Sequence, residues 1–238
     1  MLTDSGRIDR KNLAADKVYI QITACEPFFT TEIQHTRGSA FEKSTNVNQF
    51  LFETPFTSSG KAHGGVADQF KRKTVITTER SFPDLKRRLL VTSRREFEFT
   101  PIEVAIEALH DRCVKLRNAI SAPNPEAKSV QLLLQGSVRL QVNSGSMEYA
   151  RVFLDEKNRS LYRPEQIQRL IAEFREFVGL CGQALVLNRQ KLIKDDQIQY
   201  QEDLEEGFEE LKVGLEPYLK EIEGKSNVNE CVQYFYTI

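Results

Sequence analysis

The spacing of apolar residues along the chain changes once, near residue 100. Before that point, apolar and polar residues alternate in short stretches rich in β-branched and aromatic residues, which is typical of half-buried strands. Five such stretches are present, at 17–24, 48–56, 71–78, 87–91 and 96–99. Because polar turns rather than long helices separate them, the pattern predicts an antiparallel sheet.

After residue 100, apolar residues recur every three or four positions, as on the buried face of a helix. Thr100 and Pro101 suit an N-cap and a first helical position, and Glu103 completes a capping-box pattern. The spacing predicts helices at 101–120, 126–136 and 163–192, and a last one from Asp195 or Asp196 to residue 222 that Pro217 bends or shortens. Short connections favour an antiparallel four-helix bundle. The predicted fold class is therefore α+β, with an antiparallel β lobe followed by this bundle.

These patterns divide the chain into four parts. Residues 1–16 are polar and are interpreted as a connector, residues 17–99 as the β lobe, residues 100–224 as the helical lobe and residues 225–238 as a peripheral tail. One predicted helix is interrupted within 132–146. Its apolar run reaches Gly136, Val138 and Val142 then alternate with polar neighbours, and helical spacing resumes at Met147. A loop, a small hairpin, or an inserted segment that presents one side chain to a partner would each explain the break.

Composition is that of an ordinary globular protein. Of 238 residues, 40% are apolar and 28% are charged, and the length suffices for two compact lobes. The net charge of −1 argues against a general polyanion binder, although residues 1–100 carry +4 and the remainder −5. The first residues lack the apolar core of a secretory signal and no apolar run reaches transmembrane length, so we expect a cytoplasmic protein.

No pattern of a familiar catalytic, cofactor or metal site is present. The four cysteines (Cys25, Cys113, Cys181, Cys231) form no CxxC pair, and Cys113 and Cys181 fall on apolar helical faces, which predicts buried thiols. The interval from Gly136 to Gly145 has the length of a P-loop but lacks its Lys-Ser/Thr end. The acidic residues of 202–210 are interpreted as a solvated helix face. Basic runs at 71–73, 86–88 and 94–95 lack interleaved stacking aromatics, so no nucleic-acid partner is predicted.

Several motifs, taken together, resemble a known family. They are, in order, YIQIT (19–23), PFF (27–29), TPFT (54–57) with GK (60–61), RKTV (72–75), SFP (81–83), PIEVAI (101–106), LQGSV (134–138) and YARVFL (149–154). The sequences of these motifs and their order closely resemble those of the catalytic domain of the DOCK (dedicator of cytokinesis) family. Members of this family are guanine-nucleotide exchange factors for Rho-family GTPases. The resemblance spans 4–222 and implies the second and third of that domain's three lobes. Because the first lobe mediates dimerisation in the family, the resemblance also implies a monomer.

The same resemblance implies a role for the interrupted helix. In the family, the matching helix is broken by an irregular insert that carries a valine called the nucleotide sensor. The match gives Val142 this catalytic role, with Val138 as the alternative. An apolar, stiff side chain that enters a GTPase's Mg²⁺ site offers no oxygen ligand and excludes water, which destabilises the metal-bound state. The matched GTPase-binding positions are Leu132, Gly136, Val138, Asn143, Gly145 and Thr3.

Partner choice follows from the same comparison. Leu132 matches a leucine of the Cdc-type-specific branch, where the Rac-specific branch has methionine, and 182–185 (GQAL) also resembles the Cdc-type branch. Thr3 departs from the glutamine of that branch, so Rac activity stays open. No cofactor or covalent chemistry is implied, and peripheral recruitment to membranes through other domains stays open. The alternative hypothesis is a non-catalytic module that binds a GTPase or another partner through the same surface.

Overall fold

The computed structural model describes residues 14–17, 23–29, 46–60, 64–85, 88–138, 145–193 and 197–220. Two compact units are present. The β unit comprises Met1–Gly64 and Asp68–Thr100, and the helical unit comprises Gly65–Ala67 and Pro101–Ile238. The predicted α+β class, with strands first and helices afterwards, is confirmed.

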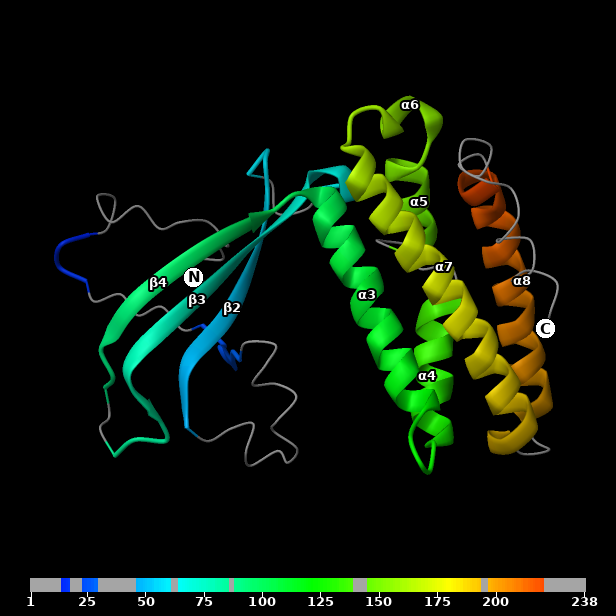
Figure 1. Cartoon of the computed structure of the whole chain (residues 1–238), viewed down its shortest axis with the longest axis horizontal. Coiled ribbons are helices and arrows are strands. Elements are labelled where there is room, and N and C mark those ends of the chain that lie inside the picture. The colour runs from blue at the N-terminus through cyan, green and yellow to red at the C-terminus, as the bar shows by residue number, and fades with distance from the viewer. Residues whose placement is uncertain are drawn as a thin grey trace. The chain divides into compact units, whose positions relative to one another are not determined.

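The described part of the β unit forms one four-stranded antiparallel sheet (Figure 1). Its strands are β1 (Glu26–Pro27), β2 (Val47–Thr57), β3 (Gln69–Phe82) and β4 (Val91–Phe99), and strands consecutive in the chain pair with each other. In the register, Phe52 lies opposite Thr74, and Thr74 opposite Glu96. The predicted strands at 48–56 and 71–78 therefore exist, each somewhat longer than predicted.

Two details of the predicted sheet were wrong. The stretch 87–91 is not a strand of its own: residues 88–90 are not in a strand, and only Val91 belongs to β4, which continues without a break to Phe99 and includes the predicted strand 96–99. Residues 91–98 are all exposed, so neither face of β4 requires apolar side chains, and the alternation that reveals a half-buried strand is missing. Pro27 does not end a strand but lies in β1, opposite Phe50, and an edge strand accommodates proline. Most of the predicted strand 17–24 lies outside the described residues.

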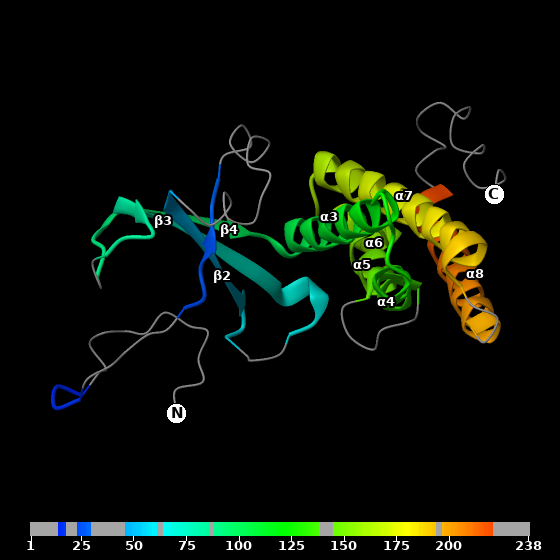
Figure 2. The ribbon, with the colours of Figure 1, turned by 90° about the horizontal axis from the view of Figure 1, so that it is seen from below.

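The described part of the helical unit contains four long helices, as predicted (Figure 1 and Figure 2): α3 (Pro101–Ile120), α4 (Ala127–Val138), α7 (Pro164–Leu187) and α8 (Ile198–Lys220). In chain order they alternate in direction (Figure 1). Two short helices, α5 (Ser146–Phe153) and α6 (Glu156–Arg159), lie between α4 and α7. A π-helical turn, η3 (Asn188–Leu192), continues α7. α8 passes through Pro217, so this residue does not terminate it.

One hydrophobic core holds the helical unit together. α3 and α7 run in the same direction, since Glu103 accepts a hydrogen bond from Gln166 and His110 contacts Glu173 further along both helices. The core contains three fully buried phenylalanines and both cysteines predicted to be buried, together with Val66 of the 3-10 turn η2 (Val66–Asp68). The largest of its fully buried apolar side chains are Phe153, Phe174, Phe177, Ile102, Leu109, Leu116, Leu134, Leu154, Leu170, Leu204 and Leu215. Among the helices described, none is long and apolar enough to cross a bilayer.

Candidate functional site

The interruption predicted in the sequence lies between α4 and α5. α4 ends at Val138 and α5 begins at Ser146, with Gly145 at its N-cap position. Val142 and Asn143 fall within 139–144, outside the described residues, and Thr3 also lies outside them. The two helix ends that flank this segment are therefore the part of the site that the structure describes.

The helix before the break is longer than predicted. It continues through Gly136 to Val138 rather than stopping at the glycine. A glycine in a helix interior costs only about 1 kcal/mol relative to alanine. Val130, Leu134 and Val138 are all buried at four-residue spacing, and their packing offsets that cost. The sequence pattern was interpreted as placing Val138 in an alternating run after the helix. In the structure, Val138 instead completes the apolar stripe of α4.

Burial distinguishes the candidate residues on α4. Leu132 is 58% exposed and lies on the surface of the helix, where a partner can reach it. Val138 is only 3% exposed and belongs to the hydrophobic core. Of the two valines considered for a role as sensor, Val138 packs inside its own unit, which favours Val142 for contact with a partner.

A pocket of about 110 Å³ lies where the ends of α4 and α5 meet α8. Gly136 and Val138 line it from α4, and Gly145 lines it from the start of α5, so the structure brings three of the predicted site residues together. Its lining also includes both charged and apolar side chains: Arg112, Glu148, Arg151, Glu210, Met147 and Leu211. The pocket also involves α8 through Gly207, Glu210 and Leu211, which sequence reasoning did not connect with the break.

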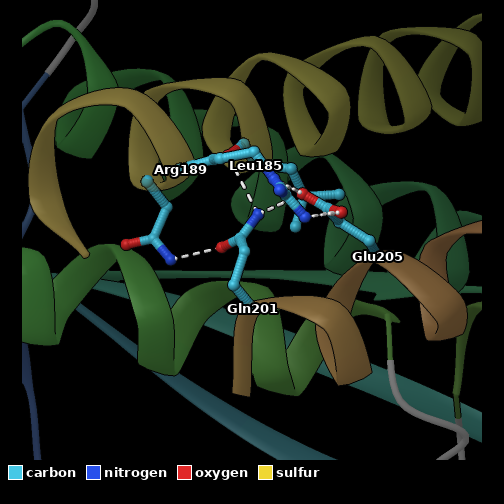
Figure 3. A network of polar contacts seen from close by, with 5 residues as sticks. Leu185, Arg189, Gln201 and Glu205 are labelled. Atoms are coloured by element: carbon cyan, nitrogen blue, oxygen red, sulfur yellow. Dashed lines mark hydrogen bonds and ion pairs between the residues drawn. The ribbon is translucent and has the colours of Figure 1, made fainter. Parts of the chain in front are cut away.

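A buried polar network joins α7, η3 and α8 (Figure 3). Asn188 donates from Nδ2 to Oε1 of Gln201 at 2.6 Å, and both side chains are almost completely buried. Gln201 donates in turn to the carbonyl oxygen of Leu185 at 3.2 Å and to Oε1 of Glu205 at 2.6 Å. Arg189 binds Glu205 with two further hydrogen bonds. These bonds fix the start of α8 against the end of α7.

The network extends to α4. Gln131 donates to Oδ1 of Asn188 at 3.3 Å, and the hydroxyl of Tyr200 donates to the carbonyl oxygen of Gln131 at 3.5 Å. Sequence reasoning missed Asn188 and Gln201. A signal was available, because each is a polar residue three positions from a core leucine, Leu185 and Leu204, on the apolar stripe of its helix.

One cluster of side chains among the described residues has the residue types and spacing of a metal site, but its carboxylates contact basic side chains. Donor atoms of Cys113, Glu173 and Glu176 lie within 4.8 Å of one another. However, Glu176 pairs with Arg117, and His110 lies 3.2 Å from Glu173. Burial, with the Glu173 carboxylate nearby, raises the pKa of the Cys113 thiol to about 11, which disfavours the thiolate that a metal requires. The cluster is thus a set of contacts that join α3 to α7.

Acidic neighbours neutralise the basic runs of the sheet. Lys71 and Lys73 both bind Glu53, each at 2.9 Å. Burial of the Glu53 carboxyl acts to raise its pKa, but the hydrogen bonds and charges of the two lysines outweigh it and lower the pKa. Arg72 binds Glu98 at 2.8 Å on the other face. These pairings give each cation of the run 71–73 an acidic partner within the sheet.

Comparison with known proteins places both units in one family. The family model described as DHR-2, Lobe B matches residues 5–81, and the model described as DHR-2, Lobe C matches residues 115–218. Dedicator of cytokinesis protein 9 of Homo sapiens is 40% identical over 221 residues, which is 93% of this chain. The chain belongs to the dedicator of cytokinesis family. Its β unit carries the lobe B match, and its helical unit carries the lobe C match.

Other dedicator of cytokinesis proteins give similar values. Protein 8 of Homo sapiens is 40% identical over 92% of this chain, and protein 7 of Mus musculus is 41% identical over 92%. The chain spans only about a tenth of the length of these relatives, 10% or 11%. The break between α4 and α5 lies within the lobe C match, as does the whole of the pocket lining except Arg112.

Proposed function

We propose that this chain is a guanine-nucleotide exchange factor for Rho-family GTPases. One observation carries the proposal: a lobe B and lobe C pair of DHR-2 in which the helix α4 stops at Val138 and the chain resumes as α5 at Ser146. This is the place at which the resemblance puts the sensor valine, Val142. The burial of Val138 supports Val142 over Val138 for that role.

The reaction requires no proton transfer and no resident metal. Mg²⁺ demands a nearly octahedral set of oxygen ligands, and GTPase switch loops respond to that coordination. A valine side chain supplies no ligand and displaces water, so its entry weakens Mg²⁺ and nucleotide together. The factor then binds the nucleotide-free GTPase more tightly than the loaded one, and fresh nucleotide with Mg²⁺ releases it. Catalysis here is differential binding.

The remaining proposed site residues are those that the resemblance gives. Leu132 is exposed on α4 and suits direct contact with the GTPase, and its identity favours a Cdc-type partner over Rac. Gly136 and Gly145 line the pocket at the two helix ends. Asn143 and Thr3 complete the proposed contacts. The two units together bind the switch regions, and Val142 acts on the metal.

The test is release of a fluorescent GDP analogue from a panel of Rho-family GTPases. Val142→Ala should lower the accelerated release rate about ten-fold or more, equivalent to ~1.4 kcal/mol of lost differential binding, while binding to nucleotide-free GTPase persists. Val213→Ala is the matched control, because Val213 is 67% exposed on α8 and outside the site. It should leave the rate unchanged.

The outcomes separate the hypotheses. If the chain accelerates release from no Rho-family member yet binds one, it is a non-catalytic GTPase-binding module. Equal activity of Val142→Ala and the unaltered chain would remove the sensor role from Val142. A larger effect on Rac than on any Cdc-type GTPase would reverse the proposed selectivity.

A further inference from the structure

α8 contacts α4 at two points one heptad apart. The hydroxyl of Tyr200 donates to the carbonyl oxygen of Gln131. Further along both helices, a Cβ added to Gly207 would lie 3.2 Å from the carbonyl oxygen of Val138. The positions 131 and 138 on α4 and 200 and 207 on α8 have the same spacing. The two helices therefore run in the same direction and stay in register over two turns, as in a parallel coiled coil.

The second contact point explains a glycine in the middle of a helix. Gly207 lies inside α8, where glycine costs about 1 kcal/mol relative to alanine. The atom nearest to its missing Cβ belongs to the backbone of Val138, so it cannot rotate away as a side chain would. Gly214, also in α8, differs: a Cβ there would meet only the flexible end of Met147. At Gly179 of α7 a Cβ would meet nothing within 4 Å.

The first contact point prevents α8 from sliding along α4. Gln201, next to Tyr200, is held by Asn188 and by the carbonyl oxygen of Leu185, both at the end of α7 (Figure 3). A shift of α8 by one helical turn would move it about 5.4 Å and break all of these bonds. The bonds of Tyr200 and Gln201 thus hold α8 in the register at which Gly207 approaches Val138.

We propose that Gly207 is a positioning residue for nucleotide exchange. It lets the backbone of α8 approach Val138, the last residue of α4, and so sets the position of the helix end that precedes the proposed sensor segment. This role rests on the proposed exchange function. An alanine at this position requires Val138 to move by a few tenths of an ångström, and reacting groups misplaced by about 1 Å can lose two orders of magnitude in rate.

The effect should fall on the rate at saturation rather than on binding. Leu132, the exposed contact residue, lies further back on α4, toward the end held by Gln131 and Tyr200. A displacement at Val138 therefore changes how the GTPase-bound factor acts on the metal and leaves the contact made by Leu132 in place. A residue of purely structural importance would instead lower the amount of folded protein or change both kinetic parameters.

The experiment measures release of fluorescent GDP from a Rho-family GTPase as a function of chain concentration. Gly207→Ala should lower the saturating rate about five-fold and keep the half-saturating concentration within two-fold. Gly179→Ala gains the same helix propensity and its Cβ meets nothing within 4 Å, so this control should retain the saturating rate. Circular dichroism verifies that all variants remain folded.

A second variant, Tyr200→Phe, tests the inference if Gly207→Ala does not fold. Tyr200→Phe removes the hydroxyl contact with Gln131 and adds no atom, and it should lower the saturating rate about two-fold at unchanged half-saturation. Full activity of a folded Gly207→Ala overturns the inference, as does full activity of Tyr200→Phe where Gly207→Ala does not fold. A chain that accelerates release from no GTPase while all variants fold removes the proposed function itself, and the positioning role with it.

Discussion

Replacing Gln201 by leucine removes three hydrogen bonds from the interior of the helical unit. Its side chain is 1% exposed, donates to Leu185 and Glu205, and accepts from Asn188. The three partners differ in what they can recover. Glu205 reaches water, and the Leu185 carbonyl oxygen still accepts from the backbone N–H of Asn188. The side-chain amide of Asn188 is 0% exposed and loses its acceptor.

The expected loss in the free energy of unfolding follows from how much each partner can recover. A buried donor without a partner costs roughly 1–3 kcal/mol, and each ordinary hydrogen bond contributes about 1 kcal/mol net. Burial of the added apolar surface of leucine offsets part of the loss. We therefore expect Gln201→Leu to lower the free energy of unfolding by about 3 kcal/mol. Removing both polar partners in Asn188→Leu/Gln201→Leu should cost about 1–2 kcal/mol less than the sum of the single variants.

Urea unfolding followed by circular dichroism at 222 nm measures both values, because that signal comes mainly from helices. With a denaturant slope near 2 kcal/mol/M, the midpoint of Gln201→Leu should shift by roughly 1.5 M. Val213→Leu, at an exposed position of the same helix, is the control and should shift little. A single variant within 0.5 kcal/mol of the unaltered chain, or strict additivity in the double variant, would refute the view that this amide pair stabilises the junction.

Two further predictions concern titration. The pKa of Glu205 is lowered, first by hydrogen bonds from Arg189; its contribution is therefore present above the unfolded pKa of about 4.3 and is lost as pH falls through the lower folded value. The urea midpoint should fall more steeply between pH 5 and 3 in the unaltered chain than in Glu205→Gln, and parallel curves would contradict this. Burial raises the pKa of the Cys113 and Cys181 thiols. Peptide mapping after alkylation at pH 8 should show rapid labelling of exposed Cys25 and slow labelling of those two, whereas equal rates would contradict their burial.

The sequence was sufficient for the fold wherever burial affected one face of an element. The long helices show the expected period, because each packs one side against the hydrophobic core. The strands β2 and β3 were found from their β-branched and aromatic content rather than from one buried face, since adjacent Thr74 and Val75 of β3 are both buried. The predicted strand 87–91 was wrong because only Val91 belongs to β4, whose exposed residues need no alternation. The end of α4 was placed two residues early because Gly136 was given more weight than the apolar spacing that includes Val138.

Candidate site residues could be predicted only as far as the resemblance and local spacing reach. The motif around Gly136 led to the predicted site, and in the structure Gly136, Val138 and Gly145 line one pocket; their role in exchange stays a prediction. The role of α8 could not be predicted. The approach of Gly207 to Val138 depends on how distant helices pack, and no local pattern encodes it. The burial of Asn188, by contrast, was accessible from the sequence, because it lies three positions after the core residue Leu185 on the apolar stripe of α7.

The exposed strand β4 leads directly into the buried start of α3, so we expect local stability to differ sharply between these two neighbouring segments. Residues 91–98 have exposed side chains, so main-chain pairing with β3 is the chief bond that holds them. Pro101 and Ile102, by contrast, are buried at once. Segments that bury little apolar surface open at low free energy, whereas core helices open only with their whole unit. Local opening of β4 should therefore cost less free energy than opening of α3, and hydrogen exchange should be faster at its amides than at those of the helix that follows.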